Sequence, residues 1–289
     1  MAEEKKNPMF NSDLFKFREP VKLFDDLYFA GNSVGGVWII VTSEGLVLIE
    51  GGGQDDFWEA CLQPSLEKLG LADRKVLSLL LTHGHFDHYG GAYFIRKATG
   101  CDVCLSAADT VHITAGLENQ VHNDKNLRAA EVTKIISPGD DLVFGDHVIS
   151  VLDGAGHTPG CLNYSMEVHD GEETHRFIMM GGYGIFGPGK ENFLGLEYPF
   201  GPEHAVEQAL IFASTCVKTW EYVKKNHCDI YFNPHPHLCA MFQHAEENKN
   251  RKPGEPNAFV IGEQGVREWL QDRFDACLQK AVDYTDIRG

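Results

Sequence analysis

The chain has 289 residues, of which 43% are hydrophobic and 23% charged, an ordinary composition for a globular protein with a sizeable core. Its 42 acidic residues outnumber the 25 basic ones, and the net charge of −17 disfavours nucleic acid and anionic membrane surfaces as partners. The N-terminus lacks the apolar segment of a secretory signal, and no stretch approaches the ~18 apolar residues of a transmembrane helix, so we expect a cytoplasmic protein.

The first elements predicted are an arm, a meander and a helix. Residues 1–20 are polar with scattered aromatic side chains, which indicates an extended N-terminal arm. Residues 21–30 and 36–51 alternate or run apolar between turns, which predicts antiparallel strands. Residues 55–69 then show the spacing of an amphipathic helix.

A cluster of metal-binding residue types follows the apolar segment 76–81, which predicts a buried strand. Side chains alternate along an extended segment, so His83, His85 and Asp87 can point the same way before His88 turns to the other side. Such a pattern can serve two ions, with imidazole and carboxylate ligands that suit zinc, iron, manganese or nickel. The cluster reads Thr82-His83-Gly84-His85-Phe86-Asp87-His88.

Helices and strands alternate after this cluster. Residues 91–98 and 107–115 have helical character and flank a predicted strand at 102–106, which indicates a layered sheet covered by helices. Cys101 and Cys104 form a CxxC by count, but residues i and i+3 of a strand face opposite sides. We therefore interpret both as buried core residues without a metal or redox role, and we expect all eight cysteines to be free thiols.

A second histidine-containing loop follows strands predicted within 135–153. His157 lies there among glycines and prolines, directly after an apolar strand, and is a candidate third ligand for the first metal. A hairpin is predicted next, with strands at 162–168 and 175–180. The loop reads Asp153-Gly154-Ala155-Gly156-His157-Thr158-Pro159-Gly160.

The last third of the chain predicts an aromatic loop, two helices and a short strand. Helical spacing covers 202–226 and 262–282, and a strand at 228–232 lies between them. The loop before the first helix is rich in glycine and proline. Its aromatic residues either form a substrate wall, or pack the loop down or form a subunit contact. The candidates for the wall are Tyr183, Phe186, Phe193 and Tyr198.

The HxHxDH motif after an apolar strand resembles the signature of the metallo-β-lactamase superfamily, and the Gly-His-Thr-Pro-Gly stretch around His157 matches the loop that supplies its next ligand. The resemblance runs from about Leu23 to the C-terminal helix. It implies the α/β fold of that superfamily, an αββα four-layer sandwich. We expect residues 21–289 to form this single domain.

Many members of that superfamily end the hairpin with an aspartate that bridges two metals, whereas the matching residues here, 180–183, include no carboxylate. The third subclass of metallo-β-lactamases also lacks the bridge and uses a late histidine in a Pro-His-Pro stretch. The resemblance to that branch implies His235 as the late ligand, with His237 as its competitor. Serines that help to hold the β-lactam carboxylate there correspond to Gly182 and Gly184, which counts against a penicillin-like substrate.

The resemblance implies a binuclear hydrolase with two divalent ions, expected to be zinc. A metal-bound hydroxide would open a lactone, lactam, ester or thioester, and Asp87 would also orient this nucleophile. The alternatives are a mononuclear iron dioxygenase of sulfur compounds, a β-lactamase proper and a non-catalytic metal-binding protein. The partner expected is a small-molecule substrate, and a homo-oligomer is left open. The two implied ligand sets are His83, His85 and His157, and Asp87, His88 and His235.

Overall fold

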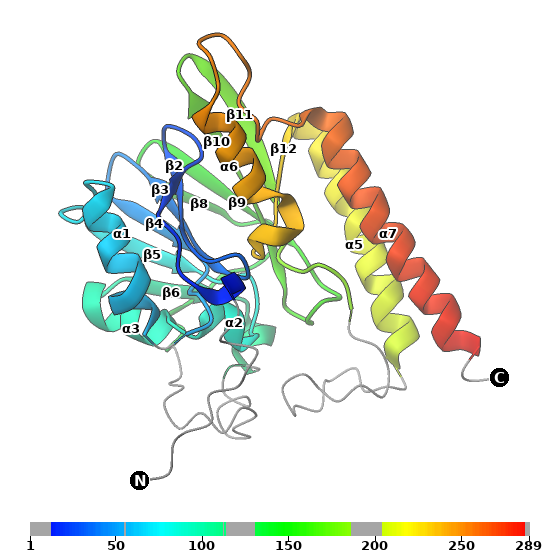
Figure 1. Cartoon of the computed structure of the whole chain (residues 1–289). Coiled ribbons are helices and arrows are strands. Elements are labelled where there is room, and N and C mark those ends of the chain that lie inside the picture. The colour runs from blue at the N-terminus through cyan, green and yellow to red at the C-terminus, as the bar shows by residue number, and fades with distance from the viewer. Residues whose placement is uncertain (1–12, 55, 112, 114–130, 186–203, 287–289) are drawn as a thin grey trace.

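Two β-sheets face each other, and helices cover the outer side of each (Figure 1). The computed structural model describes residues 13–54, 56–111, 113, 131–185 and 204–286. The order of the layers is helix, sheet, sheet, helix, so the predicted αββα sandwich is confirmed. Within the described residues, no helix combines the length and apolar character needed to cross a bilayer.

The first sheet contains seven strands in sequence order. The first four pair antiparallel, as the meander predicted, and β4 to β7 then pair parallel. The carboxyl ends of β4, β5 and β6 therefore meet at one edge, where the sites of layered α/β proteins tend to lie. The strands are β1 (Val21–Lys22), β2 (Leu27–Gly31), β3 (Gly36–Val41), β4 (Leu46–Ile49), β5 (Val76–Leu80), β6 (Asp102–Leu105) and β7 (Lys134–Ile135).

Short helical segments connect and cover this sheet. The helix predicted over 55–69 begins as a π-helical turn, η3 (Trp58–Leu62), and continues as α1 (Gln63–Lys68). Pro64 has no N–H to donate to the preceding turn, and it lies where the π-helical turn gives way to α1 and the hydrogen-bonding pattern changes. Residues 107–111 are helical, as predicted. The other segments are the 3-10 turn η2 (Asp13–Phe15), α2 (Phe86–Tyr89) and α3 (Ala92–Thr99).

The second sheet contains five strands in the order β12-β11-β10-β9-β8. The predicted hairpin is present, but its strands are longer than expected because Gly171, at a φ of 65°, allows a tight turn. The last strand pairs parallel with β11. The strands are β8 (Asp141–Phe144), β9 (His147–Asp153), β10 (Leu162–Asp170), β11 (Glu173–Met179) and β12 (Ile230–Phe232).

Two long helices, α5 (Ala205–Asn226) and α7 (Gly262–Asp286), pack side by side over the second sheet, close to their predicted positions (Figure 1). The 3-10 turn η5 (Pro236–Cys239) and helix α6 (Met241–Lys249) were not predicted. Only two residues of α6, Met241 and Ala245, are buried, so its sequence lacks a clear apolar stripe.

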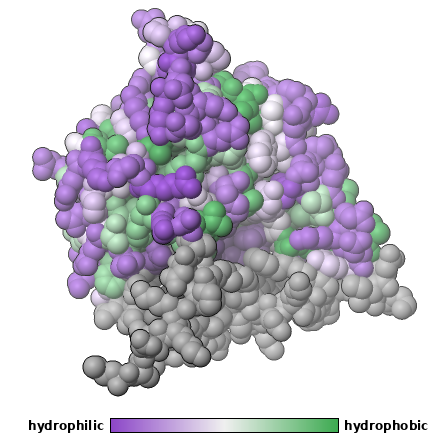
Figure 2. Space-filling model, in the orientation of Figure 1, coloured by the Kyte–Doolittle hydropathy of each residue, from purple (hydrophilic) through white to green (hydrophobic). Residues whose placement is uncertain are grey.

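The core has an apolar layer on each face of the first sheet, and the layer between the sheets is continuous with the apolar contact of the second sheet with α5 and α7. Trp38 and Ile40 of β3 belong to the layer between the sheets, whereas Val37 and Ile39 belong to the layer under the helices. Cys104 lies in the first layer and Cys101 in the second, on opposite faces as predicted. All eight cysteines are free and buried. The outer face in Figure 2 is mostly hydrophilic, as the acidic composition requires.

Tyr164 joins the two sheets directly behind the histidine-rich loop. Its hydroxyl is buried and donates a 2.7 Å hydrogen bond to the carbonyl oxygen of Leu81, just beyond the end of β5. We predict that Tyr164→Phe lowers the free energy of unfolding by about 1–2 kcal/mol, because a buried carbonyl loses its donor. Urea denaturation measures the change. The control Tyr28→Phe removes a surface hydroxyl bond to Asp25 and should cost much less; equal losses would contradict the prediction.

Candidate metal centre

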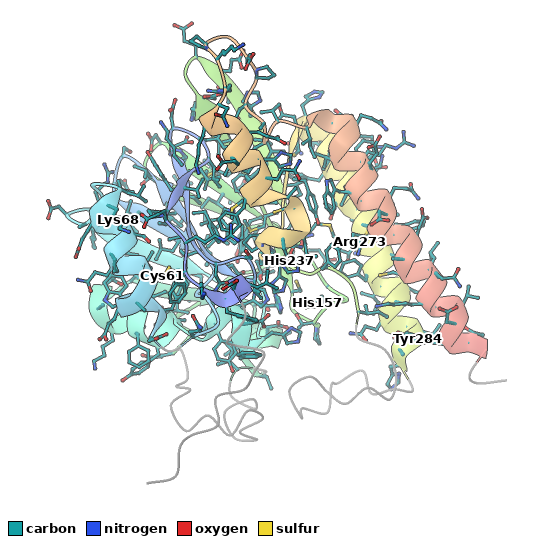
Figure 3. All side chains as sticks on the ribbon, viewed as in Figure 1. Cys61, Lys68, His157, His237, Arg273 and Tyr284 are labelled. Carbon is teal, nitrogen blue, oxygen red and sulfur yellow. The ribbon has the colours of Figure 1, made fainter. Side chains whose placement is uncertain are left out.

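Three loops meet at the seam between the sheets, each directly after a strand. The loop after β5 carries His83, His85, Asp87 and His88, with the last two on the short helix α2. His157 follows β9, and His235 follows β12. In Figure 3, His157 and His237 lie between the two halves of the sandwich. The site is therefore built from both sheets.

The first group contains three buried histidines, His83, His85 and His157, whose donor atoms lie within 4.8 Å of one another. The Nε2 atom of His83 and the Nδ1 atom of His85 are 3.0 Å apart. The ring of His157 lies 4.6 Å from that of His83 and 4.9 Å from that of His85, measured between centroids. Such a convergence of imidazoles suits a transition-metal ion.

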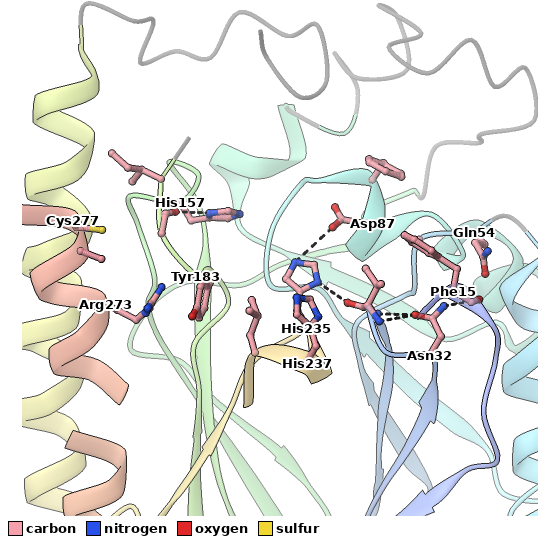
Figure 4. Close-up of a pocket in the computed structure, with 18 of the residues that line it drawn as sticks. Phe15, Asn32, Gln54, Asp87, His157, Tyr183, His235, His237, Arg273 and Cys277 are labelled. Carbon is pink, nitrogen blue, oxygen red and sulfur yellow. Dashed lines mark hydrogen bonds and ion pairs between the residues drawn. The ribbon is translucent and has the colours of Figure 1, made fainter. Parts of the chain in front are cut away.

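The second group contains Asp87, His88 and His235, again with donor atoms within 4.8 Å. The Oδ2 atom of Asp87 lies 3.5 Å from His88 Nε2. It lies 3.7 Å from His235 Nε2, a contact drawn as a dashed line in Figure 4. His237 is outside the group, and its Nδ1–H donates to the carbonyl oxygen of Ser33. The structure thus brings His235, rather than its competitor, next to Asp87.

Oxygen atoms of the protein orient four of the five histidine rings through Nδ1. The carbonyl and carboxylate oxygens can only accept, so Nδ1–H donates to them and Nε2, the acceptor nitrogen, is directed into the site; the Thr82 hydroxyl holds the His83 ring in the same orientation. His85 is the exception, because its Nδ1 faces the group. The oxygens are Thr82 Oγ1 for His83 (2.9 Å), Glu50 Oε2 for His88 (2.6 Å), Gly184 O for His157 (2.7 Å) and Val34 O for His235 (2.6 Å).

The protonation states of His83, His157 and Asp87 favour metal binding, which requires neutral imidazoles and an ionised carboxylate. Burial lowers the pKa of His157 to about 4, and burial together with neighbouring histidines holds the pKa of His83 well below its usual value. Burial opposes ionisation of Asp87, but the charges of His88 and His235 lower its pKa to about 2.

The surroundings of His88 favour a positive charge at this position. Burial disfavours its charged form, but the adjacent carboxylates of Asp87 and Glu50 raise its pKa to about 9. Its Nε2 atom is buried and has no hydrogen-bond partner among the described residues. If a divalent ion were bound by His88, its positive charge would replace that of the imidazole proton beside these carboxylates. The donor set of the second group therefore fits a metal ion.

Two buried carboxylates that support the groups were not predicted. Glu50, at the end of β4, adopts a φ of 75° and accepts from Thr82 N–H as well as from His88. Asp109 is fully buried and links the two ligand loops, because it accepts from Gly84 N–H at 2.8 Å and from Gly160 N–H at 2.6 Å. The only sequence signal for either was an acidic residue in an otherwise apolar or helical stretch.

Two of the residues that match the position of the bridging carboxylate are glycines in crowded surroundings. A Cβ atom at Gly182 would lie 2.3 Å from the Cβ of His157, and one at Gly181 would lie 2.2 Å from the carbonyl oxygen of Leu162. Neither position has room for a side chain in this backbone conformation.

The groups open into a cavity of about 580 Å³ that Asp87, His157 and His235 line (Figure 4). Tyr183, predicted for the substrate wall, also lines this cavity. The other three predicted wall residues, Phe186, Phe193 and Tyr198, lie outside the described residues. Most of the wall comes from apolar side chains and backbone that the sequence did not single out, among them Phe15, Phe57, Phe86, Ile185 and Leu238.

We predict that Asp109→Asn weakens metal binding about 10–100-fold, because the amide nitrogen would face N–H donors and loosen both ligand loops. Competition with a chromogenic chelator measures the affinity. The control is Asp153→Asn, in the His157 loop, where the carboxylate is partly exposed and pairs with Lys218. An unchanged affinity in the Asp109 variant would show that this carboxylate does not position the ligands.

Curated relatives match only part of this chain. It is 27% identical over 128 residues to a hydroxyacylglutathione hydrolase of Buchnera aphidicola. This match covers 44% of this chain and 41% of the relative. It is 30% identical over 110 residues to a hydroxyacylglutathione hydrolase of Rhodospirillum rubrum, 36% of this chain and 37% of that protein. The chain thus spans about two fifths of the length of these relatives.

Similar solved structures cover nearly the whole chain. The subclass B3 metallo-beta-lactamase BJP-1 of Bradyrhizobium japonicum superposes with a TM-score of 0.77 at 22% identity, over 97% of this chain and 100% of that one. The metallo-beta-lactamase FEZ-1 of Legionella gormanii superposes with a TM-score of 0.74 at 21% identity, over 93% of this chain and 97% of that one. At such identities the likeness shows the fold. The family model that matches residues 31–181, just over half of the chain, goes further: this protein belongs to the metallo-beta-lactamase superfamily.

Proposed function

We propose that this chain is a metal-dependent hydrolase that opens a cyclic or activated carbonyl compound: a thioester, ester, lactone or lactam. One observation carries the proposal, namely that two three-residue donor groups lie side by side at the wall of an apolar cavity. His83, His85 and His157 would hold one divalent ion, and Asp87, His88 and His235 the other. Histidine and carboxylate donors without thiolate suit zinc, which is the ion we propose.

Bound divalent ions would polarise the carbonyl and lower the pKa of a water molecule towards ~7. The chain itself supplies the positioning. The carboxylate of Asp87 stays ionised and lines the cavity, so it can accept a hydrogen bond from the attacking water and orient it. The anchored Nδ1 atoms keep the rings fixed, so little reorganisation is needed during the reaction.

Two complete groups favour a binuclear hydrolase over the alternative of a mononuclear iron dioxygenase, which would use only one of them. Among carbonyl substrates, a thioester has the support of the matched relatives, whose name describes hydrolysis of an acylglutathione. A lactam has the support of the structural neighbours. The crowding at Gly182 leaves no room there for a side chain to hold a β-lactam carboxylate, whereas a Cβ atom at Gly184 would meet nothing within 4 Å, so only the first position weighs against that class.

The wall opposite the donor groups is cationic. Arg273 and Lys280 of α7 both line the cavity, and the Arg273 guanidinium stacks 3.8 Å from the centre of the Tyr183 ring (Figure 4). One terminal nitrogen of the Arg273 guanidinium pairs with the carboxylate of Asp272, whereas its Nε atom is buried without a hydrogen-bond partner among the described residues. We propose a substrate with an apolar body and an anionic group, oriented so that the anion faces α7 and the carbonyl faces Asp87.

The cavity volume falls in the range of small-molecule sites, which supports a small-molecule substrate. Eight buried free thiols support a cytoplasmic location, where thiols stay reduced. The homo-oligomer and the single domain over 21–289 remain predictions.

We predict that the two donor groups at the cavity together hold close to two zinc ions per chain and that Asp87→Ala abolishes hydrolysis, because it removes both a ligand and the group that orients water. Elemental analysis and turnover of a panel of thioesters, lactones and β-lactams are the measurements. Asp73→Ala, at an exposed position, serves as the control. Intact turnover in the Asp87 variant would rule out this mechanism, and a single iron would favour the dioxygenase.

We predict that Arg273→Gln raises KM about 10–100-fold for an anionic substrate but hardly changes it for a neutral analogue, because a charge-assisted contact is lost. Steady-state kinetics with a matched pair of substrates measures the difference. The control Arg267→Gln lies on the same helix, where the guanidinium stacks over Trp220 rather than lining the cavity. An equal change for both substrates would contradict an anion-binding role.

A further inference from the structure

A third cluster of metal-binding side chains lies at the other end of the sandwich. It contains Asp26 from the turn between β1 and β2, His147 from the first position of β9, and His169 near the end of β10. The sequence showed only three separate turn regions here. The fold brings them together where the β10–β11 hairpin projects, at the top of Figure 1, far from α2.

The two imidazoles converge on a single carboxylate oxygen. Asp26 Oδ2 lies 2.9 Å from His147 Nε2 and 2.5 Å from His169 Nδ1, and all three donor atoms lie within 4.8 Å of one another. The side chains of His147 and Asp26 are 6% and 11% exposed, whereas that of His169 is 45% exposed. The cluster is thus buried on two sides and open to solvent on the third.

The surroundings of the cluster fix the direction of its ligand atoms. Asp146 Oδ1 lies 2.9 Å from His147 Nδ1, and the same oxygen accepts from the backbone N–H of Ser43. Asp26 Oδ1 accepts from the backbone N–H of His169, which leaves Oδ2 facing the rings. A carboxylate behind the remote nitrogen of an imidazole is the usual support of a metal-binding histidine.

We propose that Asp26, His147 and His169 form a third divalent-cation site, which takes zinc and ties the first sheet to the second at the end away from the cavity. Two imidazoles and one carboxylate with an open, solvent-facing position form a common ligand set for zinc. His147 has a carboxylate at each ring nitrogen, so a cation at Nε2 replaces a proton there and balances Asp26 and Asp146.

The spacing of the donors is compatible with an ion after a small adjustment. Neighbouring donors of a tetrahedral zinc ion, bound at ~2.0–2.1 Å, lie about 3.3 Å apart. The contacts of Asp26 must therefore lengthen by about 0.4 Å to His147 and about 0.8 Å to His169. The larger shift falls on the half-exposed side chain, which can move. The first donor group shows a similarly short separation, 3.0 Å between His83 and His85.

This site is separate from the proposed catalytic centre. His147 begins β9, whereas His157 follows the end of that strand. The strand itself, residues 147–153, spans about 20 Å. The cluster shares no residue with the two catalytic groups or the cavity lining. Its loss should therefore leave hydrolysis intact.

The test compares zinc stoichiometry in wild type, His169→Ala and His204→Ala, each as the full chain stripped with a chelator and equilibrated with buffered micromolar Zn²⁺. His204 is a matched control because its side chain is 47% exposed, close to that of His169, and lies outside the cluster. We expect His169→Ala to bind one zinc fewer per chain than the other two, with unchanged turnover. Added Zn²⁺ should also raise the melting temperature of His169→Ala less than that of wild type.

Asp26→Asn provides a second variant, since the amide keeps the shape of the side chain but not its charge. It should lose the same single ion. Because the result is a difference between variants, it does not depend on how many ions the catalytic groups hold or on whether the protein is a hydrolase. Equal stoichiometry in wild type and both variants would overturn the proposal and leave the cluster as a hydrogen-bonded contact between the sheets.

Discussion

The carboxylate of Glu50 holds the histidine-rich loop against the end of β4, and the geometry of the metal centre depends on it. One oxygen accepts from Thr82 N–H and the other from His88. Glu50 itself adopts a left-handed φ of 75°, which costs about 1–3 kcal/mol for a residue with a side chain. Its two buried, charge-assisted contacts offset that cost. The strained backbone of Glu50 thus places its carboxylate where it can hold both Thr82, at the start of the ligand loop, and His88, a ligand of the second group.

Much of the fold could be predicted because strong local patterns agree with it. The buried strand β5 and the long helices α5 and α7 have clear apolar periodicity, and Gly171 marks the hairpin turn. Helix α6 could not be predicted, because it rests on the edge of the core with two buried residues. The π-helical turn before α1 also escaped prediction, since nothing in a sequence distinguishes it from an α-helical turn.

The residues of the site also fall into those that could be predicted from the sequence and those that could not. The ligands within 83–88 are visible because they are close in sequence, and His157 and His235 because their loops resemble those of a known family. The supporting carboxylates Glu50 and Asp109 were missed, since their roles follow from which loops the sheets bring together. The cluster around Asp26 could not be found for the same reason. Its three residues are far apart in the sequence, and they meet only because β9 pairs with β10 and the two sheets pack face to face.

The order of the ligands along the chain bears on how the protein matures. The matched family region, 31–181, contains every residue of the first donor group but stops short of His235. Synthesis proceeds from the N-terminus, so the three histidines of the first group can meet soon after β9 and its following loop have been made. The second group is complete only when β12, which precedes His235, has docked beside β11. Metal loading would then proceed in two stages, and the second ion would be captured only by a nearly complete polypeptide.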